Sequence, residues 1–186
     1  IIAGPQPMSS LKIPVYQPTL ESSAAAASGL RRALDAQGKR DTQVLVLAGD
    51  GGTYDIGFQC LSSAAERNED FLYICLDNEG YMNTGMQRSS CTPYGAWTST
   101  TPIGQGSGGM PSQGKTQDAK NLPLIMVNHR CEYVATASTA YMEDLYDKLD
   151  KAIQASKRGF AYLHVYSPCT TGWRFPTDQN MEVARK

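Results

Sequence analysis

The sequence predicts an α/β fold, a doubly wound, mostly parallel sheet with helices on both faces. Apolar runs of strand length alternate with helix-length amphipathic segments, and this alternation is typical of α/β proteins. One strand ends in glycines and leads into a helix and a second strand, which forms a βαβ unit with a right-handed crossover. With 41% apolar residues to supply a core, residues 1–186 are expected to form a single domain.

The first segments of the chain are an extended stretch and a helix. Residues 1–20 carry four prolines and are expected to run extended. Ser22 or Ser23 then caps an alanine-rich helix over residues 24–37, and Gly38 closes it.

The βαβ unit follows directly. The run 43–48 is almost continuously apolar, which predicts a strand covered on both faces. It ends in the glycine turn 49–52. A helix over about 55–68 and a buried strand over 71–77 complete the unit.

A long loop separates this unit from the remaining elements. Residues 78–121 are rich in glycine and lack regular apolar repeats, and a loop of this length in a compact domain is usually functional. Within it, Gly104 to Gly114 is expected to be a flexible surface excursion. Residues 122–127 suit a strand or a helix, and Pro123 at a first turn favours the helix. The elements expected after the loop are a helix from Pro123 to His129, a strand over 133–137, a helix over 142–157 and a strand over 161–166.

Charge and hydropathy exclude two classes of partner. The chain has 17 basic and 18 acidic side chains, a net charge of −1, and no polybasic run. Nucleic-acid binding depends on clustered Lys and Arg, so a nucleic-acid partner is not expected. The longest apolar stretches, 71–76 and 122–127, are far shorter than the roughly 20 residues that cross a bilayer, so no membrane span is expected.

The chain start and the cysteines bear on processing and location. The sequence opens Ile1-Ile2 without an initiator Met or a signal peptide, which indicates a processed or partial chain. Its five cysteines are widely spaced and form no Cys-x-x-Cys pair. An odd, scattered set is typical of reduced thiols, so we expect a cytoplasmic protein without a disulfide framework.

Two neighbouring strand ends carry unusual polar sequences. Glycines at 49–52 allow the backbone to approach a phosphate, but Asp50 in that turn would repel it unless a cation lies between them. Mg²⁺ prefers hard oxygen ligands, and Asn78 adds a side-chain oxygen from the next strand end. The carbonyl of Gly80 completes one edge of an octahedron. This pattern predicts a diphosphate held through a divalent metal.

A Gly-Asp-Gly turn alone is common between a strand and a helix. The second strand end makes the pattern more specific, because the 26 residues between Gly51 and Asn78 suffice for one helix and one strand. Both loops therefore return to the same sheet edge. Neither a Walker phosphate loop nor a Gly-x-Gly-x-x-Gly turn is present, which disfavours ordinary nucleotide binding.

Gly49-Asp50-Gly51 followed by Asn78 resembles the diphosphate and Mg²⁺ signature of thiamine-diphosphate enzymes. More specifically, the chain is similar to the β subunit of 2-oxoacid:ferredoxin oxidoreductases, the pyruvate synthase family, and so implies the thiamine-diphosphate-binding fold. The stretches that carry this resemblance are Glu21 to Gly29, Gly49 to Gly57, Asp77 to Gly104, Tyr133 to Ser138 and Ser167 to Trp173.

The resemblance implies that Asp50, the Asn78 side chain and the Gly80 carbonyl hold Mg²⁺. Asn83 matches a position near the reacting carbon and is the candidate catalytic residue, bonding the substrate or an intermediate. The residues implied to surround thiamine diphosphate are Gly49, Asp50, Gly51, Gly52, Asn78, Glu79, Gly80, Tyr81, Met82 and Asn83.

By the same resemblance, the activity is oxidative decarboxylation of a 2-oxo acid such as pyruvate, an arylglyoxylate or oxalate. CoA usually takes the acyl group, and electrons reach ferredoxin through iron–sulfur clusters. An α subunit would supply the carboxylate for the aminopyrimidine, and other segments would carry the 4Fe-4S cluster, because no cluster ligands are recognised in this chain. The alternatives are a non-oxidative decarboxylase or carboligase, and a non-catalytic scaffold subunit.

Four further residues receive simpler interpretations. His129 and His164 lack ligand clusters in the sequence and are expected to be structural. Cys91 lies in the loop that the resemblance places around the cofactor, and no His is near it in the sequence. We therefore expect a small, buried apolar residue rather than a nucleophile. Arg88 suits either a substrate or CoA anion or an ion pair that anchors the loop.

Overall fold

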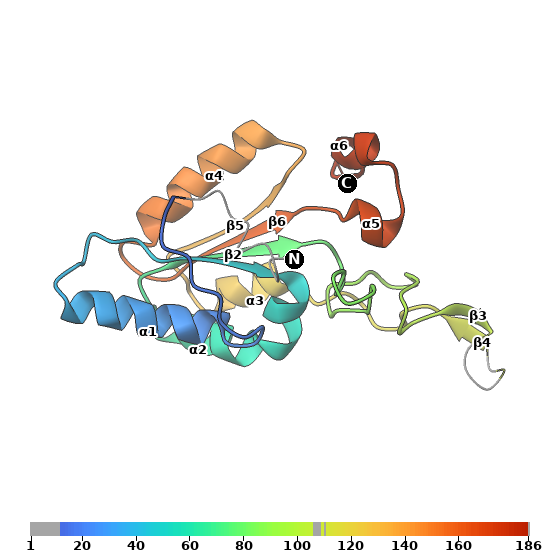
Figure 1. The fold of residues 1–186 in the computed structure, drawn as a ribbon, viewed down its shortest axis with the longest axis horizontal. Helices are drawn as coiled ribbons and strands as arrows, with labels where there is room; N and C mark the ends of the chain where they lie inside the picture. The colour runs from blue at the N-terminus through green and yellow to red at the C-terminus, as the bar shows by residue number, and fades with distance from the viewer. Residues whose placement is uncertain (1–11, 106–108, 110, 186) are drawn as a thin grey trace.

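A four-stranded parallel sheet forms the centre of the computed structural model, which describes residues 12–105, 109 and 111–185. The strand order is β1-β2-β6-β5, and every neighbouring pair is parallel (Figure 1). The strands are β1 (Leu45–Gly49), β2 (Leu72–Asp77), β5 (Tyr133–Ser138) and β6 (Ala161–Tyr166).

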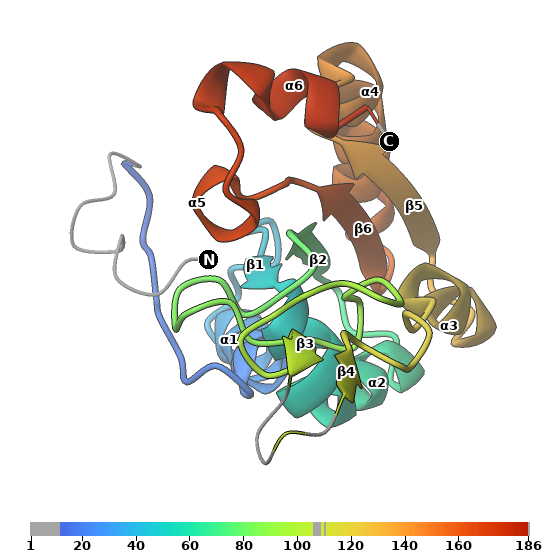
Figure 2. The same cartoon turned by 90° about the vertical axis from the view of Figure 1, so that its right-hand side faces the viewer.

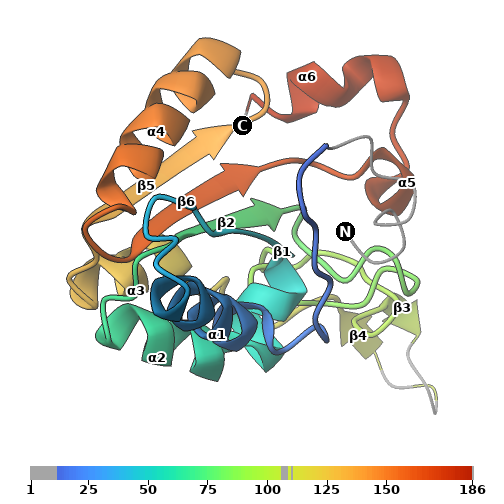
Figure 3. The same ribbon diagram turned by 60° about the vertical axis from the view of Figure 1, so that its left-hand side comes forward.

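Helices cover both faces of this sheet (Figure 3). The β1–β2 and β5–β6 crossovers run in opposite directions across the sheet, so right-handed connections place their helices on opposite faces. Two cores result, one built around Tyr73 and Tyr162 and the other around Leu163 and Val165. On the first face lie α1 (Ser23–Ala36), α2 (Phe58–Glu66) and α3 (Leu122–Asn128), and on the second lies α4 (Met142–Ala155).

The predicted α/β class, the parallel strands and the helices on both faces are confirmed. The last strand has the predicted bounds, and the ambiguous segment after residue 121 is a helix, with Asn121 accepting a hydrogen bond from the backbone N–H of Leu124. Ser22 is the N-cap of α1, although its hydroxyl makes no capping hydrogen bond, and Gly38 follows the helix with a φ of +73°.

The prediction that both faces of the first strand are covered is wrong. Val46 and Ala48 are buried, whereas Leu45 is 50% exposed and Leu47 is 42% exposed. β1 lies at the edge of the sheet, and α4 packs against β5 and β6 rather than reaching it. An apolar run therefore did not reveal that this strand is an edge strand.

The helical winding after β1 begins earlier than predicted. The chain turns into helix at Asp50 and forms a π-helical segment, η2 (Gly52–Ile56), before α2. The hydroxyl of Thr53 donates to the carbonyl of Gly49 (2.7 Å), which ties this segment to the strand end. Short π-helical segments occur frequently at functional sites.

The remaining elements are short. Within the predicted excursion at 104–114, β3 (Ile103–Gln105) and β4 (Pro111–Gln113) pair antiparallel, and residues 106–108 and 110 lie outside the described residues. The sequence did not predict the three short helices after β6. These are α5 (Thr170–Trp173), η4 (Thr177–Gln179) and α6 (Asn180–Val183). Over the described ranges, every helix is too short or too polar to cross a bilayer.

We expect Gly57→Ala to destabilise the chain strongly. A Cβ at Gly57 would lie 2.1 Å from the carbonyl oxygen of Gly52, and this backbone atom can move only if η2 is displaced. The loss should reach at least about 2 kcal/mol in the free energy of unfolding, measured by denaturant titration.

Gly29→Ala in α1 is the matched control, because a Cβ there meets nothing within 4 Å. It should raise the free energy of unfolding by about 0.5–1 kcal/mol, as expected for a helical glycine replaced by alanine. Equal effects of the two substitutions would contradict the proposed constraint on η2.

Candidate cofactor and metal site

The two strand ends singled out in the sequence meet at one edge of the sheet. In the parallel register, Gly49 of β1 lies beside Leu76 of β2, and Asp77 lies beside Tyr166 of β6. The long loop that follows β2 passes in front of these strand ends, and α5 lies next to it (Figure 2). Ligands of open parallel sheets bind at this carboxyl edge.

Asp50, Asn78 and Gly80 come together as predicted. One polar atom of the Asn78 side-chain amide lies 2.8 Å from the carbonyl oxygen of Gly80 and 2.9 Å from Oδ1 of Asp50. With the amide nitrogen in this position both contacts are hydrogen bonds, and with the amide oxygen there three oxygens converge. Adjacent ligands of an octahedral Mg²⁺ at about 2.1 Å lie about 3.0 Å apart, so the spacing and the oxygen chemistry both fit this cation.

Asp50 is a buried carboxyl group, only 1% exposed. The hydroxyl of Ser89 donates to its Oδ2 (2.7 Å), and the Cys91 thiol lies 3.0 Å from the same oxygen. Burial and, to a lesser extent, the negative charge of Asp77 raise the pKa of Asp50 to about 6, against the opposing effect of these hydrogen bonds. A cation beside Asp50 would favour the ionised form.

Cys91 connects Asp50 to a second buried carboxyl group. Its sulfur also lies 3.1 Å from Oδ1 of Asp77, whose Oδ2 lies 3.0 Å from Nε2 of His164. Burial raises the pKa of the Cys91 thiol well above its usual value, and Asp50 and Asp77 act in the same direction. Cys91 is therefore a neutral thiol, buried in the core as expected from the sequence, and its contacts with two carboxyl groups are a feature that the sequence did not predict.

Tyr81 closes over the glycine turn. Its hydroxyl donates to the carbonyl of Gly51 (2.8 Å) and to Oδ2 of Asp55 (3.2 Å). A Cβ at Gly51 would lie 2.3 Å from the Tyr81 ring, so this position requires glycine in order to accept the ring. Asp55 also accepts hydrogen bonds from the backbone N–H and the hydroxyl of Ser90, and so joins η2 to the loop.

Buried polar contacts fix the far side of the loop. Thr92 accepts a hydrogen bond from the backbone N–H of Ser89 (2.9 Å), and its hydroxyl donates to the carbonyl of Glu79 (2.6 Å). Lys115 is fully buried and donates from Nζ to the carbonyls of Ser90 (3.2 Å) and Thr92. Its burial lowers the pKa of this ammonium group. The loop is thus anchored before any ligand binds.

The other predicted residues occupy different positions around the site. Glu79 adopts a φ of +67° between the candidate metal ligands Asn78 and Gly80, and its backbone N–H donates to Oδ1 of Asp77 (2.8 Å). Met82 packs against Gly172 of α5. Gly52 is buried, whereas Asn83 is exposed in the turn that Met82 begins.

Sequence analysis missed Ser89, Cys91, Asp77 and Asp55 as parts of this site. Asp77 directly precedes Asn78 at the end of a strand, and that placement was the one available signal. Over the ranges that the structure describes, one group of three or more His, Cys, Asp or Glu side chains has convergent ligand atoms. It consists of Asp50, Asp77 and Cys91. All five cysteines are free thiols.

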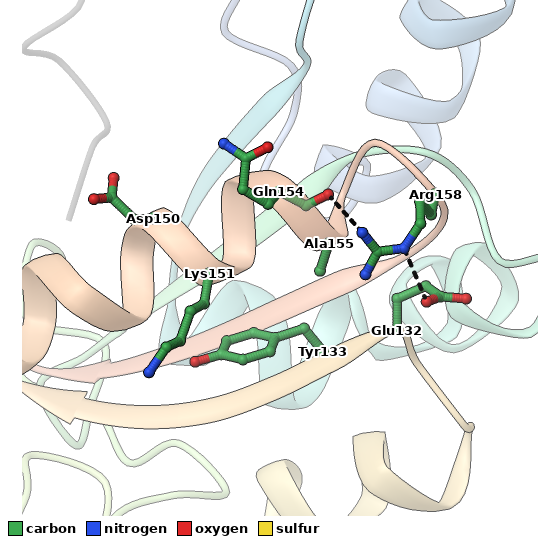
Figure 4. Close-up of a pocket in the computed structure, with 7 residues that line it drawn as sticks. All are labelled: Glu132, Tyr133, Asp150, Lys151, Gln154, Ala155 and Arg158. Atoms are coloured by element: carbon green, nitrogen blue, oxygen red, sulfur yellow. Dashed lines mark hydrogen bonds and ion pairs between the residues drawn. The ribbon is translucent and has the colours of Figure 1, made fainter.

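A hollow of about 400 Å³ lies beside the amino end of β5, the edge strand on the other side of the sheet from β1 (Figure 4). It lies beside Tyr133, at the start of β5, and two ion pairs involve charged side chains around it. Nε of Arg158 lies 3.8 Å from Glu132, and Lys151 bonds Asp147 (2.6 Å). This hollow is remote from the carboxyl edge.

Comparison with known proteins agrees with this geometry. Residues 5–165 match the family model described as thiamine pyrophosphate enzyme, C-terminal TPP binding domain. The chain belongs to this family of thiamine-diphosphate-binding proteins.

Several curated relatives are 2-oxo acid oxidoreductase subunits. The chain is 71% identical over 175 residues to the β subunit of NADH-dependent phenylglyoxylate dehydrogenase from Aromatoleum evansii, covering 94% of this chain and 38% of that protein. It is 49% identical to pyruvate synthase subunit PorB from Methanothermobacter thermautotrophicus, covering 100% and 62%. The chain therefore spans about two fifths to three fifths of the length of these relatives.

A solved structure has the same fold. It is the 2-oxoglutarate:ferredoxin oxidoreductase from Magnetococcus marinus with 2-oxoglutarate, coenzyme A and succinyl-CoA bound. The two share 25% identity and superpose with a TM-score of 0.67 over 89% of this chain and 58% of that chain.

Asp50→Ala should abolish Mg²⁺-dependent retention of thiamine diphosphate. The substitution removes the charged oxygen from the convergent set, and it also removes a buried charge beside Asp77, so the fold should persist. Isothermal calorimetry on the reconstituted complex, with circular dichroism as the folding control, checks this. Unchanged cofactor affinity would contradict the assignment.

Cys91→Ala and Cys91→Ser should separate a hydrogen-bonding role from simple packing. Alanine removes a donor to Asp50 and should weaken cofactor affinity by about tenfold, the lower end of effects seen for groups that orient metal ligands. Serine keeps a donor and should stay within about threefold of the native protein. Equal affinities for the two variants would show that the donor is dispensable.

Proposed function

We propose that residues 1–186 are a single thiamine-diphosphate-binding domain from the β subunit of a 2-oxo acid oxidoreductase. This domain would bind the cofactor's diphosphate through Mg²⁺. The observation that carries the proposal is the convergence of Asp50, Asn78 and Gly80 in a chain that belongs to the thiamine pyrophosphate family. The oxidoreductase names of its relatives support the reaction class.

The chemistry divides between the cofactor and the protein. Thiamine diphosphate, when bound, supplies the carbon that attacks a keto group and holds the electron pair left when carbon dioxide departs. Asp50, Asn78 and the Gly80 carbonyl would hold the metal, and the glycine turn at 49–52 would lie beside the diphosphate. Tyr81 and the loop around it shield this edge from water.

An aromatic 2-oxo acid is the favoured substrate. The 71% identity with a phenylglyoxylate dehydrogenase subunit exceeds the 49% identity with a pyruvate synthase subunit and the 46% identity with ketoisovalerate oxidoreductase subunit VorB from Pyrococcus furiosus. CoA is the favoured acyl acceptor because the structural relative binds coenzyme A and succinyl-CoA.

The complete enzyme would need other chains. An α subunit would provide the carboxylate that activates the aminopyrimidine, and further segments would carry the 4Fe-4S cluster and pass electrons to ferredoxin. NAD is the second candidate for final acceptor, because the phenylglyoxylate dehydrogenase is named as NADH-dependent. Five free thiols support a cytoplasmic location.

The test is anaerobic oxidation of 2-oxo acids by the purified complex. We expect phenylglyoxylate, CoA and a viologen dye to give reduced dye, carbon dioxide and an acyl-CoA. Carbon dioxide and free aldehyde without dye reduction would instead indicate a non-oxidative decarboxylase. Cofactor binding without turnover of any 2-oxo acid would indicate a scaffold.

The isolated 186-residue chain should bind thiamine diphosphate weakly and turn over no 2-oxo acid. It offers the diphosphate half of a site, and no residue in it has been assigned to the aminopyrimidine. A viologen assay of the chain beside the full complex at equal concentration checks this. Turnover by the chain alone would refute the shared active site.

Asn83→Ala should lower turnover at saturating 2-oxo acid by at least about tenfold while cofactor binding survives. An amide here can donate to the oxygen on which charge develops, and removal of one such donor typically costs about 100- to 1000-fold. Thr84→Ala in the same turn is the control, since its hydroxyl bonds the local Gln87 side chain. Equal kinetics for both variants would leave Asn83 with a turn-forming role.

A further inference from the structure

A small cavity of about 260 Å³ adjoins the proposed cofactor site. It opens between the loop after β2 and the segment that contains α5. Its lining residues are Met86, Trp97, Gly172, Trp173 and Arg174. The indole N–H of Trp173 donates to the carbonyl oxygen of Asn78 (2.9 Å), so one wall of the cavity is bonded directly to a proposed metal ligand.

The lining combines flat apolar surfaces with one cation. Two indole rings and a thioether supply the apolar walls. The guanidinium carbon of Arg174 lies 5.8 Å from the centre of the Trp97 ring. Among the described residues, no carboxylate pairs with Arg174 and no hydrogen bond satisfies its guanidinium group. A stacked guanidinium keeps its edge donors available for a carboxylate, which it can bind through two parallel hydrogen bonds.

The backbone on both sides of the cavity is held in an unusual conformation. Met86 has a φ of +62° and Arg174 a φ of +57°, a region that residues other than glycine rarely adopt. Such conformations persist where the surrounding structure imposes them, and they cluster at ligand-binding sites. Here both residues line the same cavity from opposite segments.

We propose that this cavity binds an aromatic 2-oxo acid, with the aromatic ring against Trp97 and Met86 and the carboxylate on Arg174. The assignment rests on the proposed function and adds the residues that select the substrate. Pockets for drug-sized ligands span roughly 300–1,000 Å³. A cavity of about 260 Å³ therefore suits one ring with its acid group and is too small to enclose a whole nucleotide-sized ligand such as CoA.

The experiment compares variants of the complete complex by steady-state kinetics with phenylglyoxylate, 2-oxoisovalerate and pyruvate. Trp97→Leu should lower kcat/KM for phenylglyoxylate by at least about tenfold and change the values for the two smaller acids by less than about threefold. Arg174→Met should raise the KM for every 2-oxo acid about tenfold or more with a smaller change in kcat, and Arg174→Lys should recover part of the loss. Tyr94→Ala, an exposed ring on the same loop, is the control and should match the native enzyme.

The possible results distinguish the cavity proposal from the proposed function. A native complex that oxidises small 2-oxo acids but not phenylglyoxylate would overturn the cavity proposal and the aromatic substrate, and would leave the reaction class, oxidation of a 2-oxo acid, intact. Equal effects of Trp97→Leu and Tyr94→Ala would also overturn it. If the leucine variant fails to assemble, Trp97→Phe should assemble with selectivity within about threefold of native, and loss of aromatic selectivity there would count against the stacking role. Failure to oxidise any 2-oxo acid would refute the proposed function itself.

Discussion

A buried carboxylate that its surroundings only partly compensate is the constraint on which the rest of this site depends. Removing the Asp50 charge from water is costly, and the neighbouring Asp77 adds repulsion rather than relief. Hydrogen bonds from Ser89, Cys91 and Asn78 offset part of that cost. A divalent cation would offset the remainder, so the folded chain is already arranged to receive one.

The loop after β2 supplies two of the groups that contact this carboxylate. It must bring Ser89 and Cys91 back to a strand end about forty residues earlier in the chain, and a chain this long needs its own anchors. Asp55 and the buried Lys115 provide them, one from η2 and one from the returning segment. These contacts hold the part of the loop that carries Ser89 and Cys91, which lies outside the short strands β3 and β4.

Sequence analysis identified the site residues that directly follow a predicted strand. Gly51 and Asn78 were identifiable because each follows an apolar run of strand length, and parallel strands bring their ends together. Cys91 was not identifiable as a donor, because its contacts with Asp50 and Asp77 arise from a loop path that no periodicity encodes. The exposure of Leu47 could not be predicted for a similar reason, because tertiary packing sets the strand order and places β1 at the edge of the sheet.

The π-helical start after β1 illustrates the same limit. The glycines and Asp50 signalled a turn, but the wide winding of Gly52–Ile56 depends on the space that Gly57 leaves for a carbonyl and on the bond from Tyr81 to Gly51. The first contact joins residues five apart in the same winding, whereas the second is tertiary, between residues thirty apart. Local pattern thus located the site, whereas long-range packing determined its shape.

The most direct test of this account is anomalous diffraction from the complex crystallised with Mn²⁺ and thiamine diphosphate. We expect one manganese peak bound by Oδ1 of Asp50, the side-chain oxygen of Asn78 and the carbonyl oxygen of Gly80, with the diphosphate on its open side. A peak held instead by Asp77 and the sulfur of Cys91, or no peak at this edge of the sheet, would contradict the central claim.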